Sequence, residues 1–248
     1  MATGARPGKA GPPGAPAAHG GPGVPDRLHW WAPRTGVWPP AWRFGCGVLK
    51  VTVPTIYRAR VAGREHLPAS GGLLVVSSHV HDIDPPFMAW AVRPRPIQYV
   101  AAAHNFERPF LGNLISALGA FPLRTDRPDI GGLRHAWTEL ELGRAVLIFP
   151  EGRPSYDAPV APFMQGAGLL ALAEGVTVVP AAIAGTNQVV DPLRVPRLRG
   201  PVGIAFGPPV PVPSEGSRKV RAAAVIEEAR ERVVVLDRWL RDRLAAGG

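Results

Sequence analysis

The sequence has a single cysteine, Cys46, among its 248 residues. One thiol excludes a disulfide within the chain and a thiolate cluster for zinc or iron, and it favours a reducing compartment such as the cytoplasm. No apolar run reaches the ~18 residues that a transmembrane helix needs, and no apolar segment with a cleavage site stands at the start of the chain. We therefore expect a protein that neither spans a bilayer nor carries a signal peptide.

Charged residues make up 19% of the chain and apolar residues 46%. Both values are close to ordinary globular usage, which excludes wholesale disorder and a polytopic membrane protein. The length suits one α/β domain that buries its own core, with room for an additional arm.

Acidic residues are nearly missing from residues 1–64, where Asp26 alone opposes nine Lys and Arg. This stretch thus holds almost all of the net charge of +9. It also holds four of the seven tryptophans, Trp30, Trp31, Trp38 and Trp42. Trp with Arg is typical of a bilayer interface with anionic lipid, although an arm folded onto its own core has the same composition. Nucleic acid is disfavoured as a partner because the rest of the chain has no basic excess.

Three segments follow from the composition along the chain. Residues 1–25 contain seven Gly and six Pro, which predicts a disordered tail. Residues 26–57 are rich in Trp and Arg but interrupted by Pro and Gly, which predicts a membrane-interface segment with one or two short helices. Residues 58–248 form the globular domain.

Short apolar runs alternate with helical patterns after residue 58. This alternation predicts an α/β fold, a mostly parallel sheet flanked by helices, with the N-terminal segment as an interfacial arm. The expected strands are Leu73–Ser77, Ile97–Ala101, Ala145–Phe149, Val176–Pro180 and Val202–Phe206, with a short strand near 119–123. The expected helices cover residues 85–93, 109–117, 129–142, 166–174 and 218–244.

The first chemical signal is His79, which directly follows an expected strand. In open α/β sheets ligands bind at the carboxyl ends of the strands. Asp84 comes five residues later, beside the helix start marked by Pro85 and Pro86. A carboxylate there can turn back to the imidazole, fix its tautomer and stabilise its protonated form, so His79 becomes a candidate general base.

The same segment admits a metal site as an alternative. His79, His81 and Asp84 are similar to the zinc-binding element of metallo-β-lactamase-like hydrolases, in which histidines two residues apart share one ion. The match is incomplete, because Ile83 stands where that element has Asp and Asp84 where it has His. His81 is more commonly a loop residue or a supporting donor than a catalytic group.

A second signal follows the expected strand at 145–148, in the sequence Phe149-Pro150-Glu151-Gly152-Arg153-Pro154-Ser155. Between the two signals, the expected strand at 119–123 leads to Arg124 and Arg127. Loops that follow neighbouring parallel strands meet at one edge of the sheet, so these residues predict a single cleft.

The order His-x4-Asp, Gly-x-x-Pro-x-Arg, Phe-Pro-Glu-Gly and Val-Val-Pro resembles the glycerolipid acyltransferase family over residues 57–210. The lead-in Gly63-Arg64-Glu65-His66-Leu67-Pro68 and the stretch Phe163-x-x-Gly166 are similar to that family as well. The resemblance implies an α/β enzyme that moves a fatty acyl group from acyl-CoA or acyl-carrier protein to a glycerolipid hydroxyl, most simply that of 1-acylglycerol-3-phosphate, in phospholipid synthesis.

The resemblance also implies roles for individual residues. His79 would deprotonate the acceptor hydroxyl and Asp84 would orient the ring. Acceptor-binding roles fall on Glu151 and Gly152, and a place near the acyl site falls on Pro180. The candidates for binding the acceptor phosphate are Arg124, Arg127 and Arg153, although Arg127 could instead pair with Asp126 or Asp129.

The resemblance implies no metal and no cofactor beyond the acyl donor as co-substrate. It places the enzyme peripherally at the cytoplasmic face of the membrane, with anionic lipid as a partner. The family pattern is changed at Ser78, His81, Thr125, Arg153-Pro154 and Met164, which stand where Asn, Ser, Arg, Thr-Arg and Lys are usual. These changes affect the acceptor-binding cations more than the base and its acid. The alternatives are acylation of another lipid acceptor, a zinc-dependent hydrolase that uses His79, His81 and Asp84, and a non-enzymatic lipid-binding scaffold.

Overall fold

The computed structural model describes residues 39–124, 129–156, 158–189 and 200–246. Within these residues the chain forms a seven-stranded sheet in the order β1-β7-β6-β2-β5-β3-β4. The strands are β1 (Arg60–Ala62), β2 (Gly72–Ser77), β3 (Ile97–Ala102), β4 (Ala120–Leu123), β5 (Ala145–Ile148), β6 (Val176–Ala184) and β7 (Gly203–Phe206). Only the β6–β7 pair is antiparallel among the strand pairs of the described sheet. The predicted mostly parallel α/β sheet is therefore confirmed.

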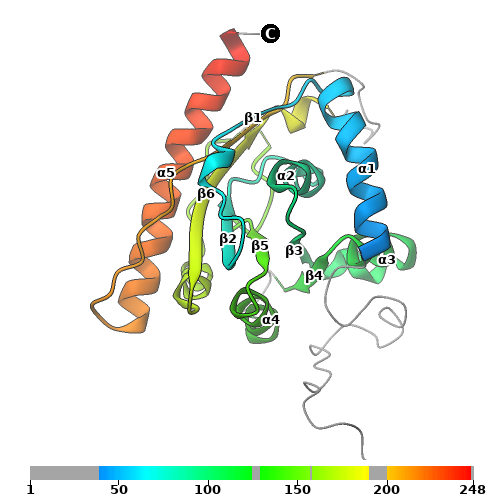
Figure 1. The fold of residues 1–248 in the computed structure, drawn as a ribbon. Helices are drawn as coiled ribbons and strands as arrows, with labels where there is room; N and C mark the ends of the chain where they lie inside the picture. Colours follow the sequence, from blue (N-terminus) through cyan, green and yellow to red (C-terminus); the bar gives the residue numbers. More distant parts are fainter. Residues whose placement is uncertain (1–38, 125–128, 157, 190–199, 247–248) are drawn as a thin grey trace, which may run out of the picture.

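Helices cover both faces of the sheet. The α-helices are α1 (Pro39–Ile56), α2 (Asp84–Val92), α3 (Pro109–Ala117), α4 (Ile130–Glu141) and α5 (Arg218–Ala246). Short 3-10 helices are η2 (Arg64–His66), η3 (Ala103–Glu107), η4 (Gln165–Leu172) and η5 (Thr186–Gln188). The long helix α5 runs along one face, and α1 and α2 lie on the other side of the sheet (Figure 1).

The two faces carry separate apolar cores because side chains alternate along each strand. In β2, Leu73 and Val75 join the core under α1 and α2, whereas Leu74 and Val76 join the core under α4 and α5. All six residues of β2 are buried, as expected for a central strand covered on both faces. This double burial explains the uninterrupted apolar runs in the sequence.

The element bounds agree with the sequence expectations to within about two residues, with two exceptions. Strand β6 continues to Ala184, four residues beyond its predicted end at Pro180. The α-helix expected over 166–174 is instead the 3-10 helix η4. Its glycines disfavour an α-helix, and one of them lies against α5 so closely that a Cβ on Gly168 would stand 2.0 Å from the Ala222 carbonyl oxygen.

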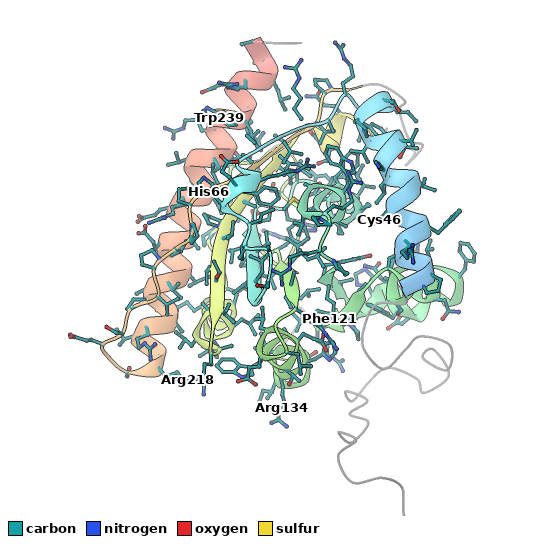
Figure 2. The ribbon with its side chains drawn as sticks, in the orientation of Figure 1. Cys46, His66, Phe121, Arg134, Arg218 and Trp239 are labelled. Atoms are coloured by element: carbon teal, nitrogen blue, oxygen red, sulfur yellow. The ribbon has the colours of Figure 1, made fainter. Side chains whose placement is uncertain are left out.

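The described part of the N-terminal arm is one continuous helix, α1. Pro39 and Pro40 occupy its first positions, where a proline costs no hydrogen bond, and Pro54 stands two residues before its last residue, Ile56. Cys46, on the side of α1 that faces the body, packs against the core (Figure 2). The predicted tail 1–25 and the tryptophans Trp30, Trp31 and Trp38 lie outside the described residues.

Across the part of the chain that the structure describes, no helix has both the length and the apolar character needed to cross a bilayer.

Candidate active site

The loops that follow β2 and β5 carry predicted site residues and begin at the same edge of the sheet. Strand β2 pairs with β5 on one side and β6 on the other, and all three are parallel. Their carboxyl ends therefore lie together, which places the segments after Ser77 and Ile148 next to each other. The strand order therefore brings together the loops that carry the first and second sequence signals.

His79 and Asp84 form the pair that their spacing predicted. His79 Nδ1 lies 3.0 Å from Asp84 Oδ2, and the Asp84 side chain is fully buried. The same oxygen accepts backbone N–H groups from Val80 at 2.6 Å and from His81 at 3.0 Å. These bonds arise because α2 begins at Asp84, after a turn in which the Asp84 N–H donates to the His81 carbonyl at 2.9 Å.

The pairing decides which ring nitrogen can act on a substrate. Asp84 Oδ2 accepts from backbone donors and so acts as an acceptor, which puts the ring proton of neutral His79 on Nδ1. Nε2 is then the basic nitrogen. Phe149 stacks on the ring with centroids 4.2 Å apart and planes 21° apart, so the imidazole is held from its face as well as from its edge.

Glu151 joins the two loops of the site through the backbone. Its Oε1 accepts the His79 N–H at 2.8 Å, and its Oε2 accepts the Ala161 N–H at 2.8 Å. Burial raises the pKa of the Glu151 carboxyl, while these two hydrogen bonds and the neighbouring His79 lower the pKa in part. Glu151 therefore fixes the main chain that carries the base, a contact that the resemblance alone did not indicate.

Ser155 bonds to the backbone carbonyl group of His79. Its N–H and its hydroxyl both donate to the His79 carbonyl oxygen, at 2.7 Å and 2.9 Å. The next residue, Tyr156, donates its N–H to the Val80 carbonyl at 3.0 Å and packs its ring edge-on against His81. The loop after β5 is thus bonded along the loop after β2.

Gly152 is placed in a turn that requires glycine. Its φ is 74°, in the left-handed region, and its N–H donates to the Phe149 carbonyl at 3.0 Å. A Cβ at this position would lie 3.1 Å from the methyl carbon of Met164, which is exposed. An apolar side chain therefore borders the turn where the family usually has a lysine.

The remaining predicted residues lie at different distances from the base. Arg153 is exposed on the loop that contacts His79. Arg124 follows β4, which is separated from β2 by β5 and β3, and its N–H donates to Asp129 Oδ2 at 3.0 Å. Pro180 is buried in β6 beside Val76 of β2. Arg127 lies outside the described residues.

The geometry of His79, His81 and Asp84 does not support the alternative of a zinc site. Asp84 Oδ2 is taken up by His79 and two backbone donors, and His81 Nδ1 accepts the Ile83 N–H at 3.4 Å. Among the described residues no group of three or more His, Cys, Asp or Glu side chains could hold a metal ion.

Two contacts of the site were missed from the sequence. Thr186 donates its hydroxyl to Asp84 Oδ1 at 2.6 Å, and Phe149 stacks on His79. Phe149 belongs to the second sequence signal, which does not predict its contact with His79. Thr186 could have been found from the longer β6, since the apolar run continues through Ala184 and ends at Gly185.

Comparison with known protein families identifies the family to which the chain belongs. A family model described as Acyltransferase matches residues 58–184, just over half of the chain. The chain belongs to the acyltransferase family. The match covers the His79–Asp84 pair, Glu151 and β6, so the protein is an acyltransferase of α/β fold and the resemblance drawn from its sequence motifs is confirmed.

Individual relatives agree with this placement. The chain is 26% identical over 206 residues to the 1-acyl-sn-glycerol-3-phosphate acyltransferase of Bacillus subtilis, covering 80% of this chain and 98% of the relative. It is 31% identical over 146 residues to the enzyme of that name from Chlamydomonas reinhardtii, covering 58% of this chain and 43% of the relative. The crystal structure of the 1-acyl-sn-glycerophosphate acyltransferase from Thermotoga maritima has the same fold, with a TM-score of 0.56, 23% identity and coverage of 83% and 85%.

Proposed function

We propose that this acyltransferase moves a fatty acyl group from acyl-CoA, or from acyl-carrier protein, to the free hydroxyl of 1-acylglycerol-3-phosphate in phospholipid synthesis. The observation that carries the proposal is the His79–Asp84 pair, 3.0 Å apart at the carboxyl edge of the sheet. The names of the relatives supply the acceptor. The acyl donor acts as a co-substrate, and no further cofactor takes part.

The chemistry needs one base and no enzyme nucleophile. His79 Nε2 takes the proton of the acceptor hydroxyl as its oxygen attacks the thioester carbonyl. The C–S bond then breaks, the new ester forms, and the protonated ring returns its proton to the leaving thiolate. Asp84 stabilises the imidazolium between these two steps, as the aspartate of a catalytic triad does.

The acceptor phosphate favours Arg153 over Arg124 as its main ligand. In the acceptor the phosphate is attached one carbon from the carbon that bears the reacting hydroxyl, so it lies close to His79 in the reactive complex. Arg153 is in the loop bonded to the His79 segment, whereas Arg124 follows a strand three positions from β2, about 14 Å away at ~4.8 Å per strand. A guanidinium suits phosphate because its donors form a fork.

We also propose that the enzyme works peripherally at the cytoplasmic face of a membrane, where a fatty acceptor resides. Support comes from an exposed apolar surface on α1 and α3. Phe44, Val48 and Val51 recur at helical spacing on α1, and Phe110 and Leu114 do so on α3. Phe44 and Phe110 are 76% and 85% exposed, which is unusual for phenylalanine outside an interaction surface.

The position of this surface suits access to bilayer substrates. The helices touch, since a Cβ on Gly45 of α1 would lie 2.9 Å from Leu118 beside α3, and Figure 1 shows them next to each other. Because α3 follows β3 and η3, its first turn with Phe110 lies at the carboxyl edge of the sheet. Exposed cations at Arg43, Lys50 and Arg108 add attraction to anionic lipid.

The test of the proposed reaction is product analysis of purified protein with acyl-CoA or acyl-carrier protein and a panel of lysolipids. We expect diacylglycerol phosphate from 1-acylglycerol-3-phosphate. His79→Ala should lower the rate by ~10²-fold or more with the fold intact, because general base catalysis contributes about this much. Asp84→Asn should come close to that loss, and His81→Ala should cost far less.

The controls separate this function from the alternatives. Equal losses in the His79 and His81 variants, together with bound zinc in purified protein, would favour the hydrolase. Unchanged transfer in His79→Ala would remove the base from the mechanism. No transfer to any lysolipid by folded wild-type protein would favour a lipid-binding scaffold.

A further inference from the structure

Thr186 is brought to the active site by the extension of β6 beyond its neighbour. The β2–β6 pairing ends at Ser77 and Ala181, yet β6 continues to Ala184, and the Ile183 N–H donates to Ser78 Oγ at 3.2 Å. The chain then turns at Gly185, with φ 89°, where a Cβ would stand 2.2 Å from the Pro201 carbonyl oxygen. Only glycine fits this turn, which places Thr186 beside Asp84 at the start of α2.

Within the described residues, the hydroxyl of Thr186 bonds to the oxygen of Asp84 that does not face His79. Thr186 Oγ1 donates to Asp84 Oδ1 at 2.6 Å, and both residues are 0% exposed. The three other donors to this carboxylate all bond to Oδ2. Among the described residues, Thr186 therefore supplies the hydrogen bond to Oδ1 in a place that excludes water, where an oxygen without a donor is costly.

We propose that Thr186 is a positioning residue for the acyl transfer, acting on His79 through Asp84; this rests on the proposed function. The torsion that turns a carboxylate is soft, so a donor on Oδ1 keeps Oδ2 directed at His79 Nδ1. The same bond draws negative charge away from Oδ2. It thereby sets how strongly Asp84 stabilises the imidazolium that forms when His79 takes the acceptor proton.

The two effects make a specific prediction for the loss of the hydroxyl. Thr186→Val keeps the shape but removes the donor, so the Asp84 carboxylate is no longer held by a hydrogen bond to Oδ1. The NMR signals of the His79 ring, which report its bond to Asp84 Oδ2, should therefore shift from their wild-type positions. The kcat should fall by about tenfold, since part of the general-base contribution is lost, with the KM values of both substrates unchanged. Thr186→Ser keeps the donor and should behave as wild type in both readouts.

The experiment is NMR spectroscopy of histidine-labelled full-length protein without substrate, combined with steady-state kinetics. His79→Gln assigns the His79 signals, and Thr177→Val, at the other end of β6, is the matched control. The ionisable groups that bond to His79, namely Asp84 and Glu151, are the same in every Thr186 variant. Thr186→Ala serves as a second hydroxyl deletion and should shift the His79 signals as well.

Three results would overturn the proposal. The first is a set of wild-type His79 signals together with a wild-type kcat in folded Thr186→Val and Thr186→Ala. The second is a loss in Thr186→Ser equal to that in Thr186→Val, since the methyl group would then be what matters. The third is unfolding of both deletion variants while the serine variant folds, which would assign the hydroxyl to stability. Because the NMR measurement needs no substrate, it decides the part played by Thr186 even if wild-type protein acylates no lysolipid and the proposed function fails.

Discussion

Replacing Glu151 by glutamine tests how the catalytic histidine is held. The family resemblance implies a role for Glu151 in acceptor binding, but both of its carboxylate oxygens accept backbone N–H groups, one from His79 and one from Ala161, each at 2.8 Å. If these bonds are its main function, Glu151→Gln should loosen the segment that carries His79. The expected result is a fall in kcat with little change in the KM for the acceptor.

The size of the effect follows from the two bonds. A hydrogen bond to a charged group contributes about 1.5–3 kcal/mol, and a neutral one about 1 kcal/mol. Glutamine keeps one acceptor oxygen and turns an N–H₂ group toward the other donor. Part of the loss is offset because the half-buried charge, and its desolvation cost, are removed. We expect a loss of about 2 kcal/mol in unfolding free energy, and ~10²-fold in kcat for an imidazole displaced by ~1 Å.

Urea unfolding and steady-state kinetics measure the two effects, with the exposed Glu174→Gln as the matched control for loss of one carboxylate. That control should leave both quantities unchanged. A Glu151→Gln protein with wild-type stability and kcat but a tenfold higher acceptor KM would refute the reasoning. Glu151 would then contact the acceptor, as the resemblance implies.

The pH dependence of stability gives an independent reading of Glu151. Burial raises the pKa of this carboxyl above its ordinary value of 4.5, so the folded protein binds the proton more tightly than the unfolded chain does. The resulting stabilisation is complete below the ordinary value and is lost as pH rises through the higher folded-state value. The stability of wild type relative to Glu151→Gln should therefore decrease with rising pH across this window, and an increase would contradict the raised pKa.

Two further outcomes are expected. Arg153→Ala should raise the acceptor KM by about tenfold through loss of a phosphate contact, and this increase should exceed that in Arg124→Ala. Hydrolysis of acyl-CoA without acceptor should be unchanged in both variants. A larger effect of Arg124→Ala on the acceptor KM would instead place the phosphate site near β4. Phe44→Ser and Phe110→Ser should each weaken binding to anionic vesicles by about tenfold, since burying such a ring stabilises by about 1.5–3 kcal/mol, yet leave activity on short-chain soluble acceptors intact. Undiminished vesicle binding would place the membrane contact elsewhere.

Much of the fold could be predicted because its signals are local. Each central strand is apolar on both faces, and the helices between strands make the connections parallel, so alternating runs indicate a covered parallel sheet. The start of α2 was also predictable, because Pro85 and Pro86 occupy its first turn. The extent of β6 and the 3-10 form of η4 were not, because both depend on which segments pack against them.

The catalytic pair was predictable for the same reason. His79 and Asp84 are five residues apart, so one turn and one helix start bring their side chains together at 3.0 Å. The sequence predicts Arg124, Arg127 and Arg153 as a group of phosphate ligands and does not rank them. Only the strand order, with β5 next to β2 and β4 at the far edge, separates Arg153 from Arg124 as a candidate for the acceptor phosphate.

The sequence by itself thus determined the α/β architecture, the family and the base with its acid, since each depends on residues close together in the chain. The tertiary structure alone decided what supports that pair. Glu151 bonds to a residue 72 positions away, and Thr186 to one 102 positions away. Such contacts form only when β6, β2 and β5 lie side by side, and that order is fixed by the burial of the whole sheet between its two helical layers rather than by any local pattern.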